Sequence, residues 1–275
     1  GEYGWAGQDS ERARTVKGLK QLFPAQVAVF SLDEESSRRK GLSPDHIVQI
    51  SYQEIEPEDI ELLAGVLNLS PIQTQLIHPI AGALREDSGD DWINAFLELH
   101  PSSAEFESLM VKIHSPVSGT ILALRRKLQS LKRMSFLSEQ STERTGDTVN
   151  RIIEYVERGM HVVLEFGRYG NDLSSYILVA NLLTRRIHEK YVQRTELAMG
   201  NESPRPKPLV ITIEEAHRFL NPGIASETIF GTIAREMRKF NVTLLVVDQR
   251  PSGIDDEILS QIATKITCSL DNDKD

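Results

Sequence analysis

Apolar and polar positions alternate along this chain in two periods, one typical of strands and the other of helices. A continuous apolar run over 209–213 stops at two adjacent carboxylates, Glu214 and Glu215. A short run of this kind, rich in β-branched residues, is typical of a strand buried on both faces of a parallel sheet. A second run over 242–247 has the same character, and helical spacing fills 226–239 between them. This order predicts two parallel strands joined by a right-handed helical crossover.

Other parts of the chain repeat the same alternation. We expect further strands over 25–30, 161–166 and 265–270, and a second strand or an extended connector over 47–55. We also expect further helices over 148–158, 173–198 and 256–264. Cys268 lies in the last of these apolar runs, so we expect a buried thiol there. The pattern as a whole predicts an α/β protein with a mostly parallel sheet flanked by helices.

The middle of the chain departs from this alternation. Apolar positions recur at helical spacing from 58 to 137, without strand signals. We therefore predict a helical bundle inserted into the α/β core. The predicted division is a first part of the core over 1–57, the insertion over 58–147, and a second part of the core over 148–275.

Composition narrows the function classes. A hydrophobic content of 40% and a charged content of 26% are ordinary for a globular protein. We predict a cytoplasmic protein with no membrane partner, because we find no apolar run of about 20 residues and no signal peptide. The net charge of -9 argues against a broadly basic DNA-coating surface but is compatible with a local basic channel. One cysteine and seven scattered histidines show no metal-ligand spacing.

Polar residues follow three of the predicted strands. These ends are Gly167-Arg168, Glu214-Glu215 and Asp248-Gln249-Arg250. Parallel strands end on one edge of a sheet, where ligands bind in open α/β folds. A carboxylate pair there suits a magnesium nucleotide, because one acid holds the metal through water and the other polarises the attacking water. The same two acids also suit the start of the next helix, so both interpretations stay open.

Two further signals lie near this pair. Gln249 is placed to bond a γ-phosphate or the attacking water, or alternatively to satisfy a loop amide. In the helix over 226–239, an apolar stripe leaves Arg235 and Arg238 on the opposite face. For an isolated helix, a solvated basic face is the usual explanation of both arginines. Because this helix borders the proposed nucleotide site, the alternative is a finger that reaches the nucleotide of a neighbouring subunit.

Four sequence blocks together resemble the HerA family, the hexameric DNA-translocating ATPases of the FtsK–HerA superfamily. The blocks are IEEAHRFL from Ile213, IAREMRKF from Ile233, VDQRPS from Val247 and ILSQI from Ile258. The opening residues Gly1-Glu2-Tyr3-Gly4 are similar to the segment that follows the second core strand in that family. The order and spacing of the blocks make the resemblance specific.

The resemblance implies a RecA-like P-loop NTPase core with a helical-bundle insertion, and ATP and Mg²⁺ as cofactors. It also implies a homo-hexamer around duplex DNA, a partner nuclease of the NurA type or a comparable effector, and a role in DNA-end processing. By motif, Glu214 takes the Walker B metal role, Glu215 is the catalytic base and Gln249 is the sensor. Arg238 is the first candidate for the arginine finger and Arg235 the second. Arg250 joins the predicted nucleotide-binding set.

One departure from the family pattern is serious. The 275 residues contain no G-x-x-x-x-G-K-[ST] loop, whose amides and lysine cradle the phosphates. We expect that loop and the N-terminal β-barrel to lie upstream in a longer parent protein. We therefore expect this chain alone to bind ATP poorly and to be inactive.

Two alternatives to an ATP-driven translocase remain. The first is a non-hydrolysing scaffold that keeps the ring and partner surfaces; retention of Glu214, Glu215, Gln249 and Arg238 argues against it. The second is a metal-dependent nuclease built on Asp255 and Asp256. The nuclease ranks below the other hypotheses, because these two residues also fit the N-terminal cap of the last helix.

Overall fold

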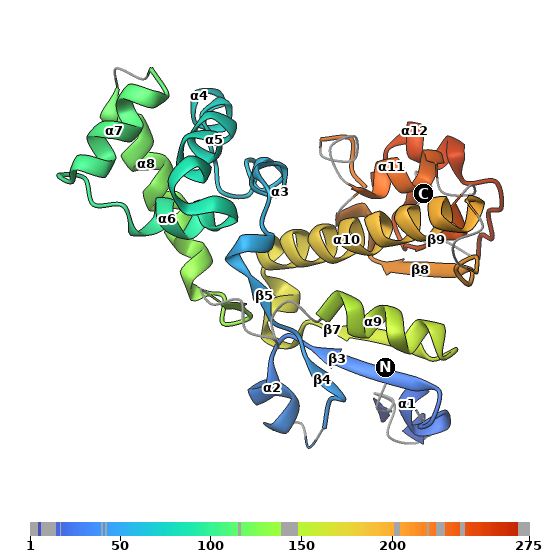
Figure 1. Cartoon of the computed structure of the whole chain (residues 1–275). Helices are drawn as coiled ribbons and strands as arrows, with labels where there is room; N and C mark the ends of the chain where they lie inside the picture. The colour runs from blue at the N-terminus through green and yellow to red at the C-terminus, as the bar shows by residue number, and fades with distance from the viewer. Residues whose placement is uncertain are drawn as a thin grey trace. The chain divides into compact units, whose positions relative to one another are not determined.

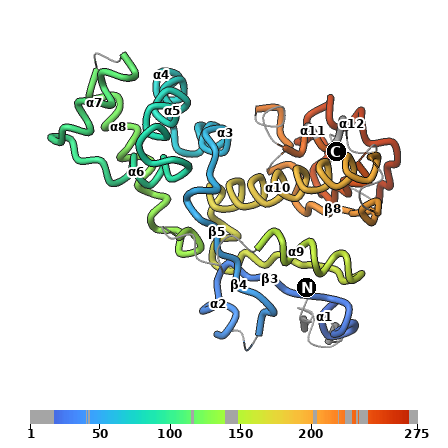
Figure 2. The backbone as a smooth tube through the Cα atoms, in the orientation of Figure 1, coloured from blue at the N-terminus to red at the C-terminus, as the bar shows by residue number. Residues whose placement is uncertain are grey.

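The computed structural model describes residues 5–6, 15–16, 18–39, 41, 43–114, 117–138, 148–200, 204–218, 220–223, 229–236 and 240–268. The chain divides into two compact units, Gly1–Tyr176 and Ile177–Asp275. The boundary falls inside one long helix, α10 (Leu173–Met199). Figure 1 labels the helices and strands of each unit, and Figure 2 traces their backbone.

A three-stranded parallel sheet forms the centre of the first unit. Its order is β4 (His46–Ile47), β3 (Val27–Ser31) and β7 (His161–Glu165). Every residue of β3 is buried, and β3 pairs with β7 from Val27↔His161 to Ser31↔Glu165. The strands predicted over 25–30 and 161–166 are therefore confirmed. Three shorter elements complete this part: the two-residue antiparallel strands β1 (Trp5–Ala6) and β2 (Thr15–Val16), and the helix α1 (Leu19–Leu22).

The stretch over 47–55, predicted as a second strand or an extended connector, forms a strand only in part. Only two short pieces of strand form in this part of the chain, β4 and β5 (Ile50–Ser51), and a 3-10 turn over Tyr52–Glu54 follows. The hydroxyl of Ser51 accepts a bond from the backbone N–H of Gln53, at 3.2 Å. Such a local bond competes with a strand ladder and starts a turn in its place.

Two helices flank this sheet. They are α2 (Glu34–Arg39) and α9 (Thr148–Glu157), the helix predicted over 148–158. The Tyr155 hydroxyl of α9 bonds His46 Nε2 at 2.9 Å, and its ring packs edge-on against Phe30. These contacts fix α9 against β3 and β4.

Helices and turns occupy the described residues from 57 to 133. The helices are α3 (Pro57–Glu61), α4 (Pro71–Gln75), α5 (Ile77–Ser88), α6 (Trp92–Glu98), α7 (Ala104–Lys112) and α8 (Ser118–Leu128), followed by a 3-10 turn over Gln129–Arg133. Trp92 anchors them, since its buried indole N–H donates to the carbonyl of Ile55 at 2.9 Å. The chain then returns through β6 (Leu137–Ser138), which pairs in parallel with β5. The division into a core interrupted over 58–147 stays a prediction.

The second unit contains a two-stranded parallel sheet. In it, β8 (Leu209–Glu214) and β9 (Val242–Val247) pair from Leu209↔Val242 to Glu214↔Val247. The connection between them includes α11 (Ile229–Glu236), and α12 (Asp256–Gln261) follows β9. The predicted strand–helix–strand crossover is confirmed. So is the α/β class, with parallel strands flanked by helices.

Two expectations for the second unit are wrong. The run over 209–213 is not buried on both faces, because Val210 is 57% exposed and its neighbours alternate between more and less covered positions. Leu245 and Val247 on β9 are exposed to a similar degree, so only one face of the two-stranded sheet is well covered. The strand expected over 265–270 is also wrong for its described part, because 262–268 pair with no described strand and Cys268 is exposed. Across the described parts of the chain, no helix combines the length and apolar character that crossing a membrane requires.

Candidate functional site

The carboxylate pair lies where β8 ends. Glu214 is the last residue of the strand and is exposed, and Glu215 adopts a positive φ of 53°. A residue other than glycine rarely adopts this conformation, which costs about 1–3 kcal/mol and is common at functional sites. In the described residues directly after Glu215, the chain forms one 3-10 turn, Ala216–Arg218. If the two acids serve as the start of a helix, the helical segment that directly follows them is this one turn.

Asp248 joins the loop after β8 to the end of β9. Its side chain is only 3% exposed. Its Oδ2 accepts the backbone N–H of His217 at 2.6 Å, and its Oδ1 accepts the N–H of Arg250 at 2.6 Å. Burial raises the pKa of this carboxyl, but these bonds and His217 outweigh it and hold the pKa below its ordinary value. Asp248 is therefore an anion that ties two loops together.

The ring of His217 extends this connection toward Glu215. Its Nδ1 lies 2.9 Å from Asp248 Oδ2 and 3.8 Å from Glu215 Oε2. Because the buried carboxylate accepts, Nδ1 carries the proton in this arrangement. Asp248 orients the imidazole, and the imidazole lies beside the predicted catalytic base. Sequence reasoning did not assign a role to His217, although its place in the block from Ile213 was the available signal.

Gln249 and Arg250 follow Asp248 directly and are both exposed. Glu214 pairs in register with Val247, so the residues just beyond them on the two strands lie at the same edge. Glu214, Glu215, Gln249 and Arg250 are therefore brought together at the carboxyl edge of β8 and β9. Their assigned roles in nucleotide binding and hydrolysis stay predictions.

The structure describes the two arginine-finger candidates less completely than the residues at the strand edge. Arg235 lies in α11, but its side chain falls outside the described part of the structure, and Arg238 falls outside it altogether. The inward face of α11 buries Phe230 and Ile233, each 1% exposed. Asn181 on α10 accepts the first helical N–H of α11, from Ile229, at 2.9 Å. This contact fixes the start of the helix that contains Arg235, the second candidate.

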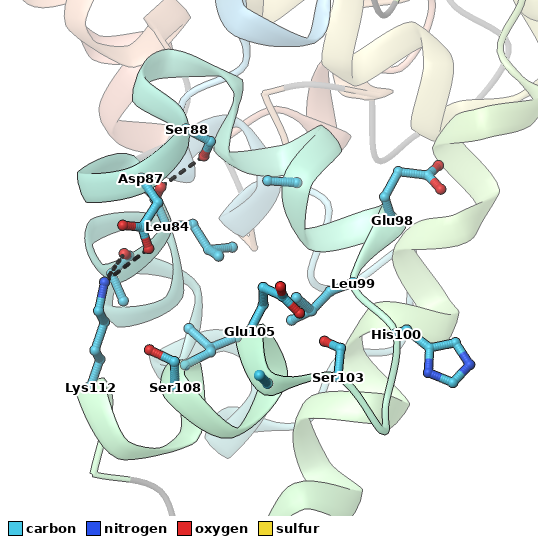
Figure 3. Close-up of a pocket in the computed structure, with 14 residues that line it drawn as sticks. Leu84, Asp87, Ser88, Glu98, Leu99, His100, Ser103, Glu105, Ser108 and Lys112 are labelled. Atoms are coloured by element: carbon cyan, nitrogen blue, oxygen red, sulfur yellow. Dashed lines mark hydrogen bonds and ion pairs between the residues drawn. The ribbon is translucent and has the colours of Figure 1, made fainter.

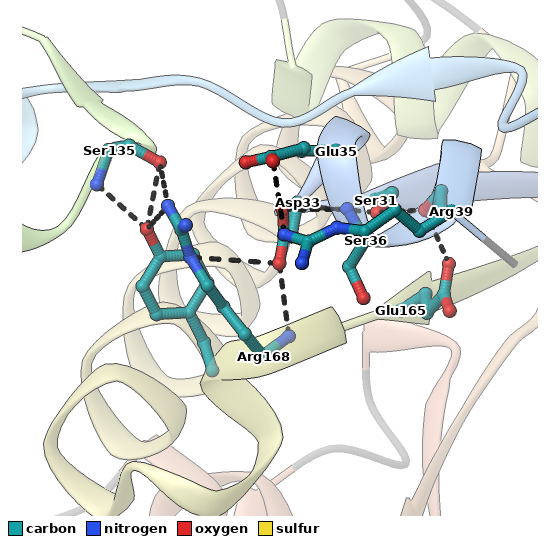
Figure 4. Close-up of polar contacts among 10 residues, drawn as sticks. Ser31, Asp33, Glu35, Ser36, Arg39, Ser135, Glu165 and Arg168 are labelled. Atoms are coloured by element: carbon teal, nitrogen blue, oxygen red, sulfur yellow. Dashed lines mark hydrogen bonds and ion pairs between the residues drawn. The ribbon is translucent and has the colours of Figure 1, made fainter.

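A second polar cluster lies at the carboxyl ends of β3 and β7 in the first unit. Figure 4 shows Asp33 between the N–H groups of Ser36 and Arg168, which donate to its carboxylate at 3.1 and 3.2 Å. Burial raises the pKa of Asp33, but these bonds and the nearby Arg168 charge hold it below its ordinary value. Gly167 approaches this carboxylate so closely that an added Cβ would lie 2.6 Å from Asp33 Cβ.

Arg168 connects this cluster to the end of the helical region. Its Nη2 donates to the Tyr169 hydroxyl at 2.9 Å and to Ser135 Oγ at 3.0 Å. The Tyr169 bond raises the pKa of the guanidinium. Burial raises the pKa of Tyr169, but bonds from Ser135 and Arg168 lower it by more. Of the three polar strand ends, this one belongs to the first unit, so their predicted meeting at one edge is established only for the two in the second unit.

The donor set at the β8–β9 edge fits a magnesium nucleotide. Mg²⁺ keeps several waters and binds through one or two carboxylates together with substrate phosphates. Glu214 and Glu215 provide two such carboxylates, the second 48% exposed. Within the described residues, no group of three or more His, Cys, Asp or Glu side chains is placed to hold a metal ion by itself.

Comparison with known proteins identifies the family of this chain. The family model for the central domain of helicase HerA matches residues 1–187. The chain belongs to the HerA family. This match ends before Glu214, so it is independent of the blocks over 213–262 that carried the resemblance.

Three curated relatives bear the name DNA double-strand break repair helicase HerA. The protein of Sulfurisphaera tokodaii is 24% identical over 96% of this chain and 53% of its own length. That of Pyrococcus furiosus is 24% identical over 98% and 55%. That of Saccharolobus solfataricus is 37% identical over 45% of this chain and 24% of its own length. This chain thus spans about half the length of the first two HerA relatives.

Proposed function

We propose that this chain is part of an ATP-driven DNA translocase of the HerA type that acts in the processing of DNA ends. The observation that carries the proposal is the joint placement of Glu214, Glu215 and Gln249 at one strand edge, in a chain of the HerA family. The names of the relatives support helicase activity in DNA repair. The proposed protein is a cytoplasmic homo-hexamer around duplex DNA, with a NurA-type nuclease or comparable effector as its partner.

In this proposal each residue at the edge has one task. Glu214 holds Mg²⁺ through water, and Glu215 polarises the water that attacks the γ-phosphate of ATP. Gln249 bonds the γ-phosphate or that water, and Arg250 contributes to nucleotide binding. Residues 1–275 contain no phosphate-binding loop motif, and the chain spans about half the length of its first two HerA relatives, so the proposal concerns the whole protein.

His217 and Asp248 have a supporting task in the same mechanism. The buried Asp248 fixes the imidazole, and the imidazole lies 3.8 Å from the Glu215 carboxylate. This restricts the positions that Glu215 adopts before substrate arrives. A carboxylate fixed in advance needs less reorganisation when the attacking water becomes charged.

The test uses the full-length parent protein. ATP hydrolysis is measured with Mg²⁺, with and without linear duplex DNA, and translocation is measured by displacement of a bound third strand. We expect Mg²⁺-dependent hydrolysis that duplex DNA stimulates, together with strand displacement that requires ATP. Hexameric rings that bind DNA but hydrolyse no ATP would overturn the proposal in favour of a non-hydrolysing scaffold.

A further inference from the structure

A cavity of about 610 Å³ lies among α5, α6 and α7, within the helical region of the first unit. Figure 3 shows it open between these helices and the loop that joins α6 to α7. Three leucines, Leu84, Leu99 and Leu109, form its floor, and their exposed fractions are 8%, 8% and 2%. Small residues widen it, namely Ala83, Ala95, Ala104, Ser103 and Ser108. The floor is therefore apolar, and the space above it has room for several side chains.

Acidic side chains dominate the rim of this cavity. Asp87, Glu98 and Glu105 line it, against a single lysine, Lys112. Lys112 is already bound by two carboxylates, Glu86 at 2.9 Å and Asp87 at 3.0 Å, so its charge is more than balanced. Lys132, which is not among the lining residues, pairs with Glu98.

Glu105 carries the clearest excess charge on the rim. Bonds from its own backbone N–H and from Ser103 lower the pKa of its carboxyl, so it stays ionised at neutral pH. Together with the pair Glu86–Asp87 around one lysine, it leaves the opening of the cavity negative. An apolar floor under a negative rim selects an apolar group that carries positive charge beside it.

We propose that this cavity is a docking site for a short amphipathic helix of a partner protein. Apolar side chains at helical spacing would enter above Leu84, Leu99 and Leu109, and flanking lysine or arginine residues would meet Glu105 and Asp87. Helices α5 and α7 border the apolar floor, which is the arrangement that an added helix completes in a bundle. Helix-in-groove recognition uses this combination of apolar anchors and matching rim charge.

The site is separate in chemistry from the nucleotide edge, and the proposal does not depend on ATP hydrolysis. A neutral apolar ligand would leave the rim carboxylates without a role. A polyanion such as DNA would meet repulsion from the same groups. The partner that fits is therefore a basic, amphipathic protein segment, and the cavity supplies the specificity for its apolar residues.

The probe for the test is a fluorescent synthetic helix of about 15 residues, with leucines at i, i+3, i+4 and i+7 and lysines on its remaining face. A second peptide keeps the leucines and replaces every lysine with glutamate. Binding to the full chain is measured by fluorescence anisotropy. We expect the lysine peptide to bind at least about tenfold more tightly than the glutamate peptide, with a difference that shrinks as salt rises.

A matched pair of variants tests whether the cavity itself is used. Ser108→Trp places a large ring in the opening from an exposed lining position of α7. Val111→Trp places the same ring on the same helix, at a position 72% exposed and outside the lining. We expect Ser108→Trp to weaken lysine-peptide binding about tenfold or more and Val111→Trp to leave it within about twofold.

A charge variant completes the test. Glu105→Gln removes the ionised rim group and should weaken the lysine peptide while leaving the glutamate peptide no weaker. Circular dichroism confirms that each variant is folded. Equal binding of the two peptides, or equal binding by Ser108→Trp and Val111→Trp, would overturn the proposal.

Discussion

The backbone N–H of His217 donates a 2.6 Å hydrogen bond to Oδ2 of Asp248, which ties the chain after β8 to the end of β9. The bond lies two residues beyond Glu215, whose φ of 53° already marks a constrained backbone. A buried carboxylate thus holds together the two segments that carry the predicted catalytic groups. Because the contact is between a side chain and the main chain, it fixes the loop independently of the His217 ring.

Asp248→Asn tests this tie through stability and its pH dependence. We expect a loss of about 1–3 kcal/mol at neutral pH, since an amide cannot replace both accepting oxygens. The folded pKa of Asp248 lies below its ordinary value, so the stability it adds is present above the unfolded pKa and is lost as pH falls through the folded pKa. Urea unfolding should therefore show that the free energy of unfolding decreases less in the variant than in the wild type when the pH is lowered below about 4.

The control for Asp248 is Asp256→Asn, a change at an exposed position of α12. It removes the same charge from the same unit without breaking the tie to His217. The structural role of Asp248 is wrong if both variants unfold at the same urea concentration at every pH.

Glu215→Gln tests the predicted catalytic base in the full-length parent protein. The amide keeps the shape of the side chain but cannot accept a proton, so we expect ATP hydrolysis to fall by about 10²–10⁴. ATP binding, measured with a fluorescent analogue, should stay close to that of the wild type. Glu58→Gln changes an exposed glutamate of α3 in the same way and should leave both quantities unchanged. Near-normal turnover in Glu215→Gln would refute the assignment.

Gly167→Ala tests the close contact between the end of β7 and Asp33. Gly167 has a φ of 56°, and an added Cβ would lie 2.6 Å from Asp33 Cβ. Gly159 also has a positive φ, 81°, but an added Cβ there would meet nothing within 4 Å. Gly159→Ala therefore measures the backbone cost alone, which is about 1–2 kcal/mol.

We expect Gly167→Ala to lower the free energy of unfolding by about 1–3 kcal/mol more than Gly159→Ala, because Asp33 or the β7 loop has to move. Urea unfolding followed by circular dichroism gives both values. Equal losses for the two variants would show that the contact with Asp33 relaxes without cost.

The strands that carry the candidate site were predictable, because their signal is local. An apolar run that stops at a polar cluster predicted β8 to within one residue and β9 at its observed bounds. The parallel topology then placed Glu214 near Gln249, since parallel strands end at the same edge. The burial of β8 was not predictable in this way. It depends on which elements cover each face of the sheet, and Val210 is exposed because one face of the β8–β9 pair is open.

The polar contacts that support the sites were not predictable from spacing. Asp248 and His217 are separated by 31 residues, and Asp33 and the N–H of Arg168 by 135. Each pair comes into contact only when the strands are paired in their native register. A strand pattern also cannot show whether a partner strand exists, which is why the apolar run before Cys268 suggested a buried thiol and the structure exposes it.

We expect Arg238 to act on the ATP of the adjacent subunit. In the helix predicted over 226–239, the apolar stripe of Ile229, Ile233, Met237 and Phe240 leaves Arg238 on the opposite face, at about 100° per residue. A planar guanidinium holds two phosphate oxygens at once, and arginine fingers are worth about 10³–10⁵ in rate in other phosphate-transfer enzymes.

The measurement mixes full-length Arg238→Ala protein with full-length Glu215→Gln protein, each inactive alone, and assays ATP hydrolysis. In mixed rings some interfaces pair an intact Glu215 with an intact Arg238, so activity should partly return. Mixed rings that form but recover no activity would instead assign Arg238 a role within its own subunit.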